Sequence, residues 1–197
     1  MVTVGVTGGL GAGKSTACQF LKEKGAYIFN ADEVAKDILQ ENTDVQEKIT
    51  EAFGPGIVKD GKVDTQKLAK VAFLSEENQT LLNNIIHPLV IEEFEKKFEE
   101  LKDKEGLLVV DAPLIFESGF DTHLDHTVVI YTTFKHRMER SLRRGNISRD
   151  EVLRRMELQM PEEEKRELAS YVIENNGSIE ELKKRIYELY DELTGTS

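Results

Sequence analysis

The strongest constraint on the fold lies near the amino terminus, where residues 8–15 read Gly-Gly-Leu-Gly-Ala-Gly-Lys-Ser. This stretch matches the pattern G-x-x-x-x-G-K-[ST] of a phosphate-binding loop, or P-loop. Residues 2–6 are short, apolar and β-branched, which predicts a buried strand. Residues 17–23 predict the first turns of a helix. A strand, a glycine loop and a helix are the context that the motif requires, so we predict that the chain binds a nucleotide polyphosphate.

The residue types of this loop suit a cluster of anionic oxygens. Backbone N–H groups converge on phosphates only where side chains are absent and positive φ angles are allowed, which the glycines permit. The following helix directs the positive end of its dipole at the same phosphates. Lys14 is predicted to reach the β- and γ-phosphates, and the Ser15 hydroxyl to coordinate Mg²⁺. The predicted ATP-binding residues of the loop are Gly8, Gly9, Gly11, Ala12, Gly13, Lys14, Ser15 and Thr16.

Strand and helix patterns alternate through much of the chain. Further strands are predicted at residues 26–30, 107–111, 126–131 and 171–174. This pattern is typical of an α/β fold, here a doubly wound five-stranded parallel sheet of the P-loop kinase type. By analogy with small-molecule kinases, the expected strand order is 2-3-1-4-5. The predicted core of this single domain comprises about residues 1–31, 105–134 and 168–197.

Residues 32–104 interrupt the alternation and are predicted to be largely helical. We interpret them as an insertion that covers one side of the site. The dipeptide Asp60-Gly61 predicts a turn within this insertion. Two separate helices are predicted over residues 76–86 and 89–104, with Pro88 in the first turn of the second helix.

Two carboxylates are candidates for chemistry because each stands at the carboxyl end of a predicted strand, where ligands bind in open parallel sheets. Asp32 follows the second strand and begins a helix, which fits a catalytic base or a simple N-cap. Asp111 ends the third strand, the usual place for the second group that holds Mg²⁺ beside a P-loop. His87 fits either a substrate contact or a helix cap. Leu114 and Phe116 fit packing or a wall for an apolar part of the substrate.

Charge is distributed unevenly along the chain. The formal net charge is −11, which argues against nucleic acid as the main partner. Residues 135–155 nevertheless contain eight Lys or Arg against three acidic residues, and seven of the nine arginines. Such a cluster suits a second, mobile set of phosphate contacts, and the alternative is a solvated helix face. We interpret residues 135–167 as an arginine-rich lid with a helix break at Gly145-Asn146. Its best candidates for gripping ATP are Arg140, Arg144 and Arg149, and Asn175 to Gly177 form a turn at the presumed adenine edge.

Composition adds a prediction about compartment. The apolar runs are at most about six residues long, which predicts neither a transmembrane segment nor a signal peptide. The single cysteine, Cys18, cannot form an internal disulfide, which fits a reducing cytoplasm. We predict that Cys18 is a small buried hydrophobe rather than a reactive thiol.

The sequence favours a kinase over a GTPase-type switch. A switch needs an Asn-Lys-x-Asp guanine signature and an Asp-x-x-Gly after the third strand, and neither occurs here. A kinase needs a base at the acceptor hydroxyl and a lid that excludes water. Asp32 is the candidate for the base, and the arginine cluster is the candidate for the lid.

Taken together, these residues resemble those of one family, the dephospho-coenzyme A kinases. The resemblance covers nearly the whole chain. It is carried by residues 5–16, 30–32, 87–89 and 113–117, Arg140, Arg144, residues 148–149, Gln159 and residues 172–177. The family pattern usually has Asp-Ala-Asp where this chain has Asn30-Ala31-Asp32, and the proposed base of the family maps onto Asp32.

The resemblance implies transfer of the ATP γ-phosphoryl group to the ribose 3′-hydroxyl of dephospho-CoA, the last step of coenzyme A synthesis. It implies ATP and Mg²⁺ at the P-loop, with Ser15 and Asp111 at the metal, and an acceptor-binding role for residues 32–104. The implied catalytic residues are Asp32, Lys14 and Arg140, and the implied acceptor contacts are Asp32, His87, Leu114, Phe116 and Glu117. We expect a cytoplasmic monomer or small homo-oligomer with no nucleic-acid or membrane partner. A kinase for another small acceptor, such as a nucleoside monophosphate or a sugar acid, remains an alternative.

Overall fold

The computed structural model describes residues 1–59, 61–145 and 148–196. The chain forms two compact units, one made of Met1–Asn30 and Phe98–Ser197 and the other of Ala31–Lys97. Two residues of predicted turns, Asp60 and Asn146, lie outside the described residues.

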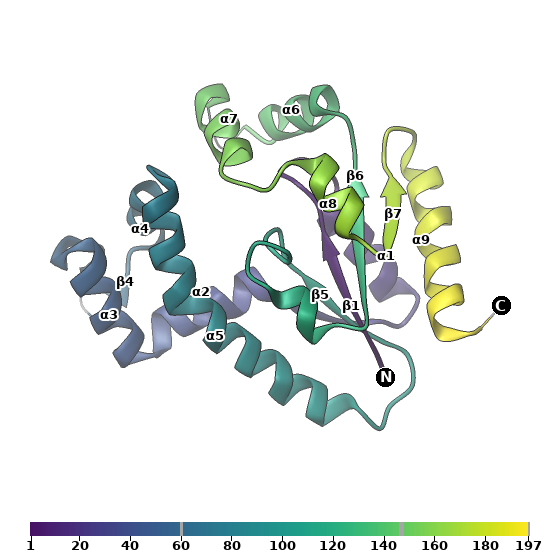
Figure 1. The fold of residues 1–197 in the computed structure, drawn as a ribbon, viewed down its shortest axis with the longest axis horizontal. Coiled ribbons are helices and arrows are strands. Elements are labelled where there is room, and N and C mark those ends of the chain that lie inside the picture. Colours follow the sequence, from purple (N-terminus) through teal and green to yellow (C-terminus); the bar gives the residue numbers. More distant parts are fainter. Residues whose placement is uncertain (60, 146–147, 197) are drawn as a thin grey trace. The chain divides into compact units, whose positions relative to one another are not determined.

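Within the described residues, the first unit is built on a five-stranded sheet whose neighbouring strands all run parallel (Figure 1). In spatial order the strands are β2 (Tyr27–Asn30), β5 (Leu107–Asp111), β1 (Val2–Thr7), β6 (His126–Tyr131) and β7 (Tyr171–Glu174). The predicted α/β fold and the predicted strand order are therefore confirmed. The register pairs Asp111 with Asn30 on one side and with Val6 on the other. The carboxyl ends of β2, β5 and β1 therefore lie next to one another at the same end of the sheet.

Helical segments follow the strands of this unit. They are α1 (Lys14–Glu23), η2 (Phe120–His123), α6 (Phe134–Arg143), α7 (Arg149–Glu157), α8 (Glu162–Leu168) and α9 (Ile179–Thr194). The Ser148 hydroxyl accepts from the Glu151 N–H at 3.2 Å and caps α7. Ser178 and Glu181 form a complete capping box at the start of α9. The α7 helix ends at Glu157.

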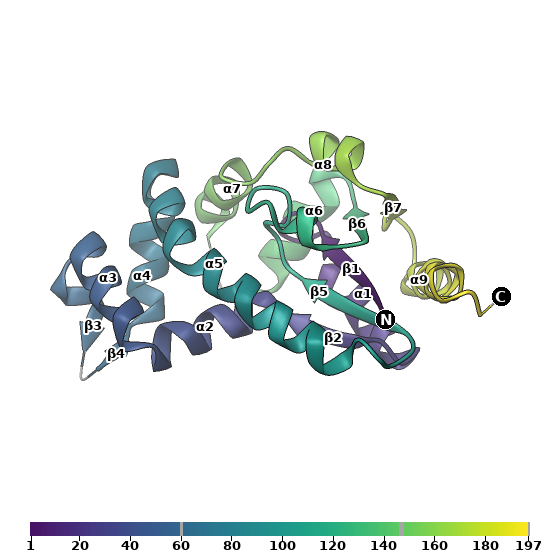
Figure 2. The ribbon, with the colours of Figure 1, turned by 60° about the horizontal axis from the view of Figure 1, so that its bottom comes forward.

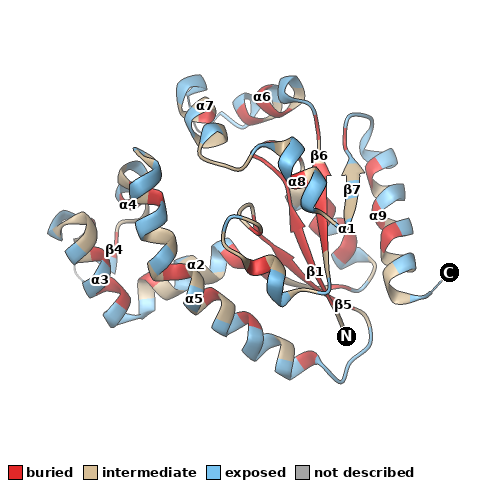
Figure 3. Cartoon of the chain, viewed as in Figure 1, coloured by how far each residue is buried: buried red, intermediate tan, exposed pale blue. Residues whose placement is uncertain are grey.

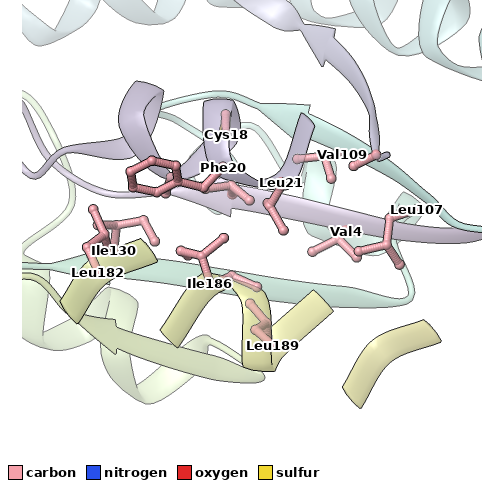
Figure 4. Close-up of a cluster of buried hydrophobic side chains, with 14 residues drawn as sticks. Val4, Cys18, Phe20, Leu21, Leu107, Val109, Ile130, Leu182, Ile186 and Leu189 are labelled. Atoms are coloured by element: carbon pink, nitrogen blue, oxygen red, sulfur yellow. The ribbon is translucent and has the colours of Figure 1, made fainter. Parts of the chain in front are cut away.

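Both faces of the three central strands, β5, β1 and β6, are covered, which explains why these strands are largely apolar (Figure 3). On one face, Val4 packs with Leu21 of α1 and Ile186 of α9 in a cluster that joins the two helices to the sheet (Figure 4). On the other face, a Cβ at Gly5 would collide with the side chains of Ile115 and Leu124.

The second unit is mostly helical, and Figure 2 shows its small hairpin beside α3 and α4. Its elements are α2 (Ala31–Glu41), α3 (Thr43–Phe53), η1 (Pro55–Ile57), β3 (Val58–Lys59), β4 (Lys62–Val63), α4 (Thr65–Ala72) and most of α5 (Glu76–Leu101). Side-chain oxygens of Asn42, Asp64 and Ser75 cap α3, α4 and α5 by accepting hydrogen bonds from backbone N–H groups at 3.0–3.2 Å. Among the described residues, no helix has both the length and the apolar character needed to cross a membrane.

The prediction of two helices separated at His87-Pro88 was wrong, because α5 runs unbroken from Glu76 to Leu101 with Pro88 inside it. A proline removes one helical hydrogen bond and frees the carbonyl four residues earlier. That residue, Asn84, is exposed, so water can take the place of the lost donor. An interior proline therefore did not end this helix, and His87 is not the cap of a new one.

Candidate active site

The P-loop, residues 8–13, connects β1 to α1 in a compact turn. Gly11 and Gly13 have φ angles of +83° and +99°, in the left-handed region that L side chains rarely adopt. Inside the loop, the Ala12 N–H donates to the Gly9 carbonyl oxygen at 2.9 Å. The turn leads directly into the N-terminus of α1, where helix N–H groups and the helix dipole favour an anion.

Lys14 and Asp111 form an ion pair at the end of the sheet where the P-loop lies. Their side chains are 15% and 8% exposed. Sequence reasoning assigned Lys14 to the ATP phosphates and Asp111 to the metal. The structure brings the two predicted residues into direct contact, so the positive charge of the P-loop and the carboxylate at the end of β5 belong to one site.

Cys18 lies one turn after Lys14 in α1 and is buried. Burial raises the pKa of its thiol, and the nearby Asp111 carboxylate raises that pKa further. The thiol therefore stays protonated at neutral pH and lacks the thiolate needed for nucleophilic reactivity. The prediction of a buried hydrophobe is confirmed.

Arg140 and Asn175, both predicted to bind ATP, meet at the carbonyl of Ala12 in the P-loop. The Asn175 Nδ2 group donates to the Ala12 carbonyl oxygen at 2.8 Å, and the Arg140 Nη1 group lies 3.4 Å from the same oxygen. The Arg140 Nη2 group also donates to the Asn175 carbonyl at 3.0 Å. The structure thus joins α6, the turn after β7 and the P-loop, which places Arg140 and Asn175 beside the predicted nucleotide.

The other two predicted lid arginines lie on the surface. Arg144 follows the last residue of α6, and Arg149 is the first residue of α7. Both are exposed. Their exposure fits a role as ATP ligands and also fits the alternative of a solvated helix face, so both predictions remain open.

Sequence reasoning missed Arg137, which is 7% exposed although it is an arginine. Its Nη1 group lies 2.8 Å from the Glu162 Oε1 atom, and both groups lie against Gly9 of the P-loop, where they would collide with a Cβ. A signal was available, because residues 137, 138 and 141 fall on one face of α6 and that face is buried. Gln159, matched only through the family resemblance, accepts from the Leu10 N–H at 3.2 Å.

The segment after β5 contains three predicted acceptor contacts. Leu114 and Phe116 are half-buried. Glu117 accepts from the Met160 N–H at 2.9 Å and forms an ion pair with Lys165 at 2.9 Å. Lys165 was also missed: its side chain is fully buried, and its ammonium donates to the Pro113 carbonyl at 2.9 Å. Glu117 therefore contributes to contacts within the first unit, and its contact with substrate stays a prediction.

Two predicted site residues belong to the second unit. Asp32 is exposed and is the second residue of α2, so it lies within the first helical turn rather than at the N-cap. A carboxylate in that turn is stabilised by the helix dipole. His87 is half-buried in the interior of α5.

The second unit also contains a hollow of about 630 Å³. It is lined by Val34, Asp37, Ile38, Glu41, Asn42, Thr43, Asp44 and Glu93. Four of these residues are acidic, so the hollow repels a phosphorylated ligand and does not suit the anionic part of a nucleotide.

A parallel α/β sheet with a P-loop after its first strand, and with the loop lysine paired to a carboxylate at a strand end, defines the class of P-loop nucleotide-binding proteins. The family model for dephospho-CoA kinase matches residues 2–181. The chain therefore belongs to the dephospho-CoA kinase family.

Relatives and solved structures agree with this assignment. The chain is 41% identical to a dephospho-CoA kinase of Salinibacter ruber over 197 residues, which covers 99% of both chains. It is 37% identical to a dephospho-CoA kinase of Aquifex aeolicus over 98% of both chains. Among solved structures, the dephospho-CoA kinase of Campylobacter jejuni superposes with a TM-score of 0.73 at 28% identity, covering 98% of both chains. A shikimate kinase of Acinetobacter baumannii, with a TM-score of 0.55 at 17% identity, shares the fold.

Proposed function

We propose that this protein transfers the γ-phosphoryl group of ATP to the ribose 3′-hydroxyl of dephospho-CoA, giving coenzyme A and ADP. The observation that carries the proposal is the Lys14–Asp111 pair beside the P-loop, in a chain whose family membership extends over residues 2–181. Phosphoryl transfer needs positioning and charge stabilisation more than covalent chemistry, and a P-loop with a partly buried lysine supplies both.

The P-loop amides and the N-terminus of α1 hold the β- and γ-phosphates of ATP in this proposal. Lys14 leaves its contact with Asp111 to neutralise the charge that builds on the β–γ bridge. The Ser15 hydroxyl and the Asp111 carboxylate are hard oxygen donors that fit Mg²⁺, which usually takes only one or two protein ligands beside phosphates and water. When bound there, Mg²⁺ adds positive charge beside the transferred group.

Asp32 is the proposed base that orients and deprotonates the 3′-hydroxyl. Chain connectivity supports this role, because Asp32 follows Asn30 by two residues and two residues span at most about 7 Å. Asn30 ends β2 and is paired in register with Asp111. Covalent connection alone therefore keeps this carboxylate near the strand ends where the metal and the phosphates belong in this proposal.

The remaining parts of the proposed mechanism bind and enclose the substrates. The second unit, Ala31–Lys97, binds the acceptor, with His87 as a candidate contact. Leu114 and Phe116 form an apolar wall. Arg140 sits at the P-loop, and Arg144 and Arg149 reach the triphosphate when the lid closes and excludes water. ATP and dephospho-CoA are small soluble metabolites, so we place the reaction in the cytoplasm, where Cys18 stays reduced.

A panel of acceptors tests the proposal, with ADP formation from Mg–ATP as the readout. Dephospho-CoA should stimulate ADP formation far above the rate without acceptor, and nucleoside monophosphates and sugar acids should not. Stimulation by one of those acceptors instead would assign a different kinase activity. Tight nucleotide binding with no acceptor-dependent turnover would indicate a switch protein and end the proposal.

A further inference from the structure

The chain that leads from α7 into the first turn of α8 contacts the P-loop twice. We define the connector as residues 159–165, of which the last four belong to α8. Its Gln159 Oε1 atom accepts the Leu10 N–H at 3.2 Å, and its Glu162 carboxylate lies 2.8 Å from the Arg137 guanidinium, which rests on Gly9. Two consecutive P-loop residues are therefore held by one short piece of chain about 150 residues away in sequence.

The connector is itself fixed at its other end. The Met160 N–H and the Lys165 ammonium both contact Glu117 Oε1 at 2.9 Å, and Lys165 also donates to the Pro113 carbonyl at 2.9 Å. Pro113 and Glu117 follow β5, the strand that ends in Asp111. The connector thus spans from the loop after β5 to the P-loop.

The contact with α6 leaves no room for a side chain at two P-loop positions, Gly9 and Gly11. A Cβ at Gly9 would collide with Arg137 and Glu162, and a Cβ at Gly11 would collide with the Arg137 carbonyl and the Ser141 hydroxyl. These glycines are thus required by packing within the protein as well as by the approach of a phosphate. Any movement of Arg137 must change the space available to Gly9.

The Arg137–Glu162 pair is poorly built as a source of stability. Its side chains are 9% and 11% exposed, so both ions have lost most of their hydration. The Arg137 Nε group and both Glu162 oxygens form no well-directed hydrogen bond among the described residues. Buried pairs of this kind often add little to stability compared with apolar replacements of similar volume. Another reason is needed for a charged pair at this position.

We propose that Arg137, Gln159 and Glu162 are positioning residues that hold Gly9 and Leu10 in the phosphate-binding shape of the P-loop. They act through the loop backbone and do not touch the substrate. Asn175 and Arg140 hold the Ala12 carbonyl from the other side. The loop is thereby fixed at both ends before the nucleotide arrives, so its amides need no reorganisation when charge develops on the transferred phosphoryl group.

The inference rests on the proposed phosphoryl transfer and is tested with Arg137→Met and Gln159→Met in the full-length protein. We measure kcat, the KM for dephospho-CoA, ADP affinity by calorimetry, and the thermal midpoint. Because a misplacement of about 1 Å can cost roughly 100-fold in rate, we expect kcat to fall by about 10- to 100-fold in Arg137→Met. The KM for dephospho-CoA should stay within about twofold. Arg137→Lys, which retains the charge facing Glu162, should recover a large part of kcat.

Two further variants separate positioning from general stability. Arg166→Met removes a partly exposed ion pair with Glu163, one residue from Glu162 on the same helix, and should leave kcat unchanged. Arg137→Met/Glu162→Leu removes both charges, should keep the thermal midpoint near that of wild type, and should be no more active than Arg137→Met, because the pair acts as a unit.

The outcomes are distinct. Turnover within twofold of wild type in both Arg137→Met and Gln159→Met overturns the inference. The inference is also overturned if, in each variant, the fall in kcat is fully explained by a smaller fraction of folded protein. If Arg137→Met does not fold, Gln159→Met decides the question, because its half-buried site tolerates a methionine of similar size. A wild-type protein that does not phosphorylate dephospho-CoA contradicts the proposed function instead, and the effect of each variant on ADP affinity then still tests the positioning of the P-loop.

Discussion

Replacing Lys14 with methionine should have two separable effects, one on catalysis and one on folding. The substitution removes the positive charge proposed to meet the β- and γ-phosphates. It also leaves the Asp111 carboxylate, 8% exposed, without its paired ammonium. The first effect lowers turnover, and the second lowers the free energy of unfolding.

The size of both effects follows from the burial of the pair. Removing one partner of a fully buried ion pair costs about 3–5 kcal/mol. Because Lys14 is 15% exposed and water can reach the remaining charge, we expect about 2–3 kcal/mol here. For a chain of this length that corresponds to a fall of roughly 4–12 °C in the thermal midpoint. The loss of one preorganised charge at the transferred group should lower kcat by about 100- to 1,000-fold.

The assay pairs ADP formation with urea unfolding for four proteins: wild type, Lys14→Met, Lys14→Met/Asp111→Asn, and Lys22→Met. In the double variant no charge is left unpaired, so stability should return to within about 1 kcal/mol of wild type while activity stays low. Lys22→Met, at an exposed position of the same helix, should change neither quantity.

Two results would refute this reasoning. Turnover of Lys14→Met within tenfold of wild type would remove Lys14 from the phosphate site. Equal stability of the single and double variants would show that Asp111 does not depend on Lys14 for its charge.

Three further predictions concern other parts of the first unit. Arg140→Ala removes one of the two side chains that contact the Ala12 carbonyl and should lower kcat by roughly tenfold or more with a smaller change in acceptor KM; an unchanged rate in steady-state kinetics would show that Arg140 belongs to a solvated helix face. Ile186→Ala should lower the free energy of unfolding by about 2–5 kcal/mol, because this side chain is fully buried between α9 and the sheet; a urea-unfolding change below about 1 kcal/mol would contradict the packing. A hydrogen bond from Lys183 lowers the pKa of Glu23. The stabilising effect of the ionised Glu23 carboxylate is therefore present above about pH 4.5 and is lost as the pH falls through the lowered pKa. Thermal midpoints between pH 6 and pH 3 should therefore fall less steeply in Glu23→Gln, and an unchanged slope would exclude this pair.

The strands could be predicted because their causes are local, whereas their order was expected only by analogy with small-molecule kinases. A strand covered on both faces is apolar along almost its whole length, as β5 is. The P-loop pattern located the site, and the position of Asp111 at a strand end indicated a role beside it. The same reasoning overestimated the effect of Pro88, because a lost hydrogen bond on an exposed helix face costs less than one in a buried segment.

The residues that support the P-loop could not be predicted in the same way. A buried charge depends on a partner that is distant in sequence: Arg137 on Glu162, and Lys165 on Glu117 and the Pro113 carbonyl. From composition alone, Arg137 was one of eight basic residues in a window interpreted as a phosphate clamp. The structure divides that window, because Arg137 is buried against Gly9 whereas Arg144 and Arg149 are exposed.

The most direct test of the mechanism is the turnover of Asp32→Asn, measured together with the separate dissociation constants of ATP and dephospho-CoA. Asp37→Asn, an exposed carboxylate of the same helix, serves as the matched control. If Asp32 is the base, kcat should fall by about 100- to 10,000-fold, both dissociation constants should stay within about threefold of wild type, and the control should behave as wild type. Near-normal turnover of Asp32→Asn, or a defect confined to ATP binding, would contradict the account.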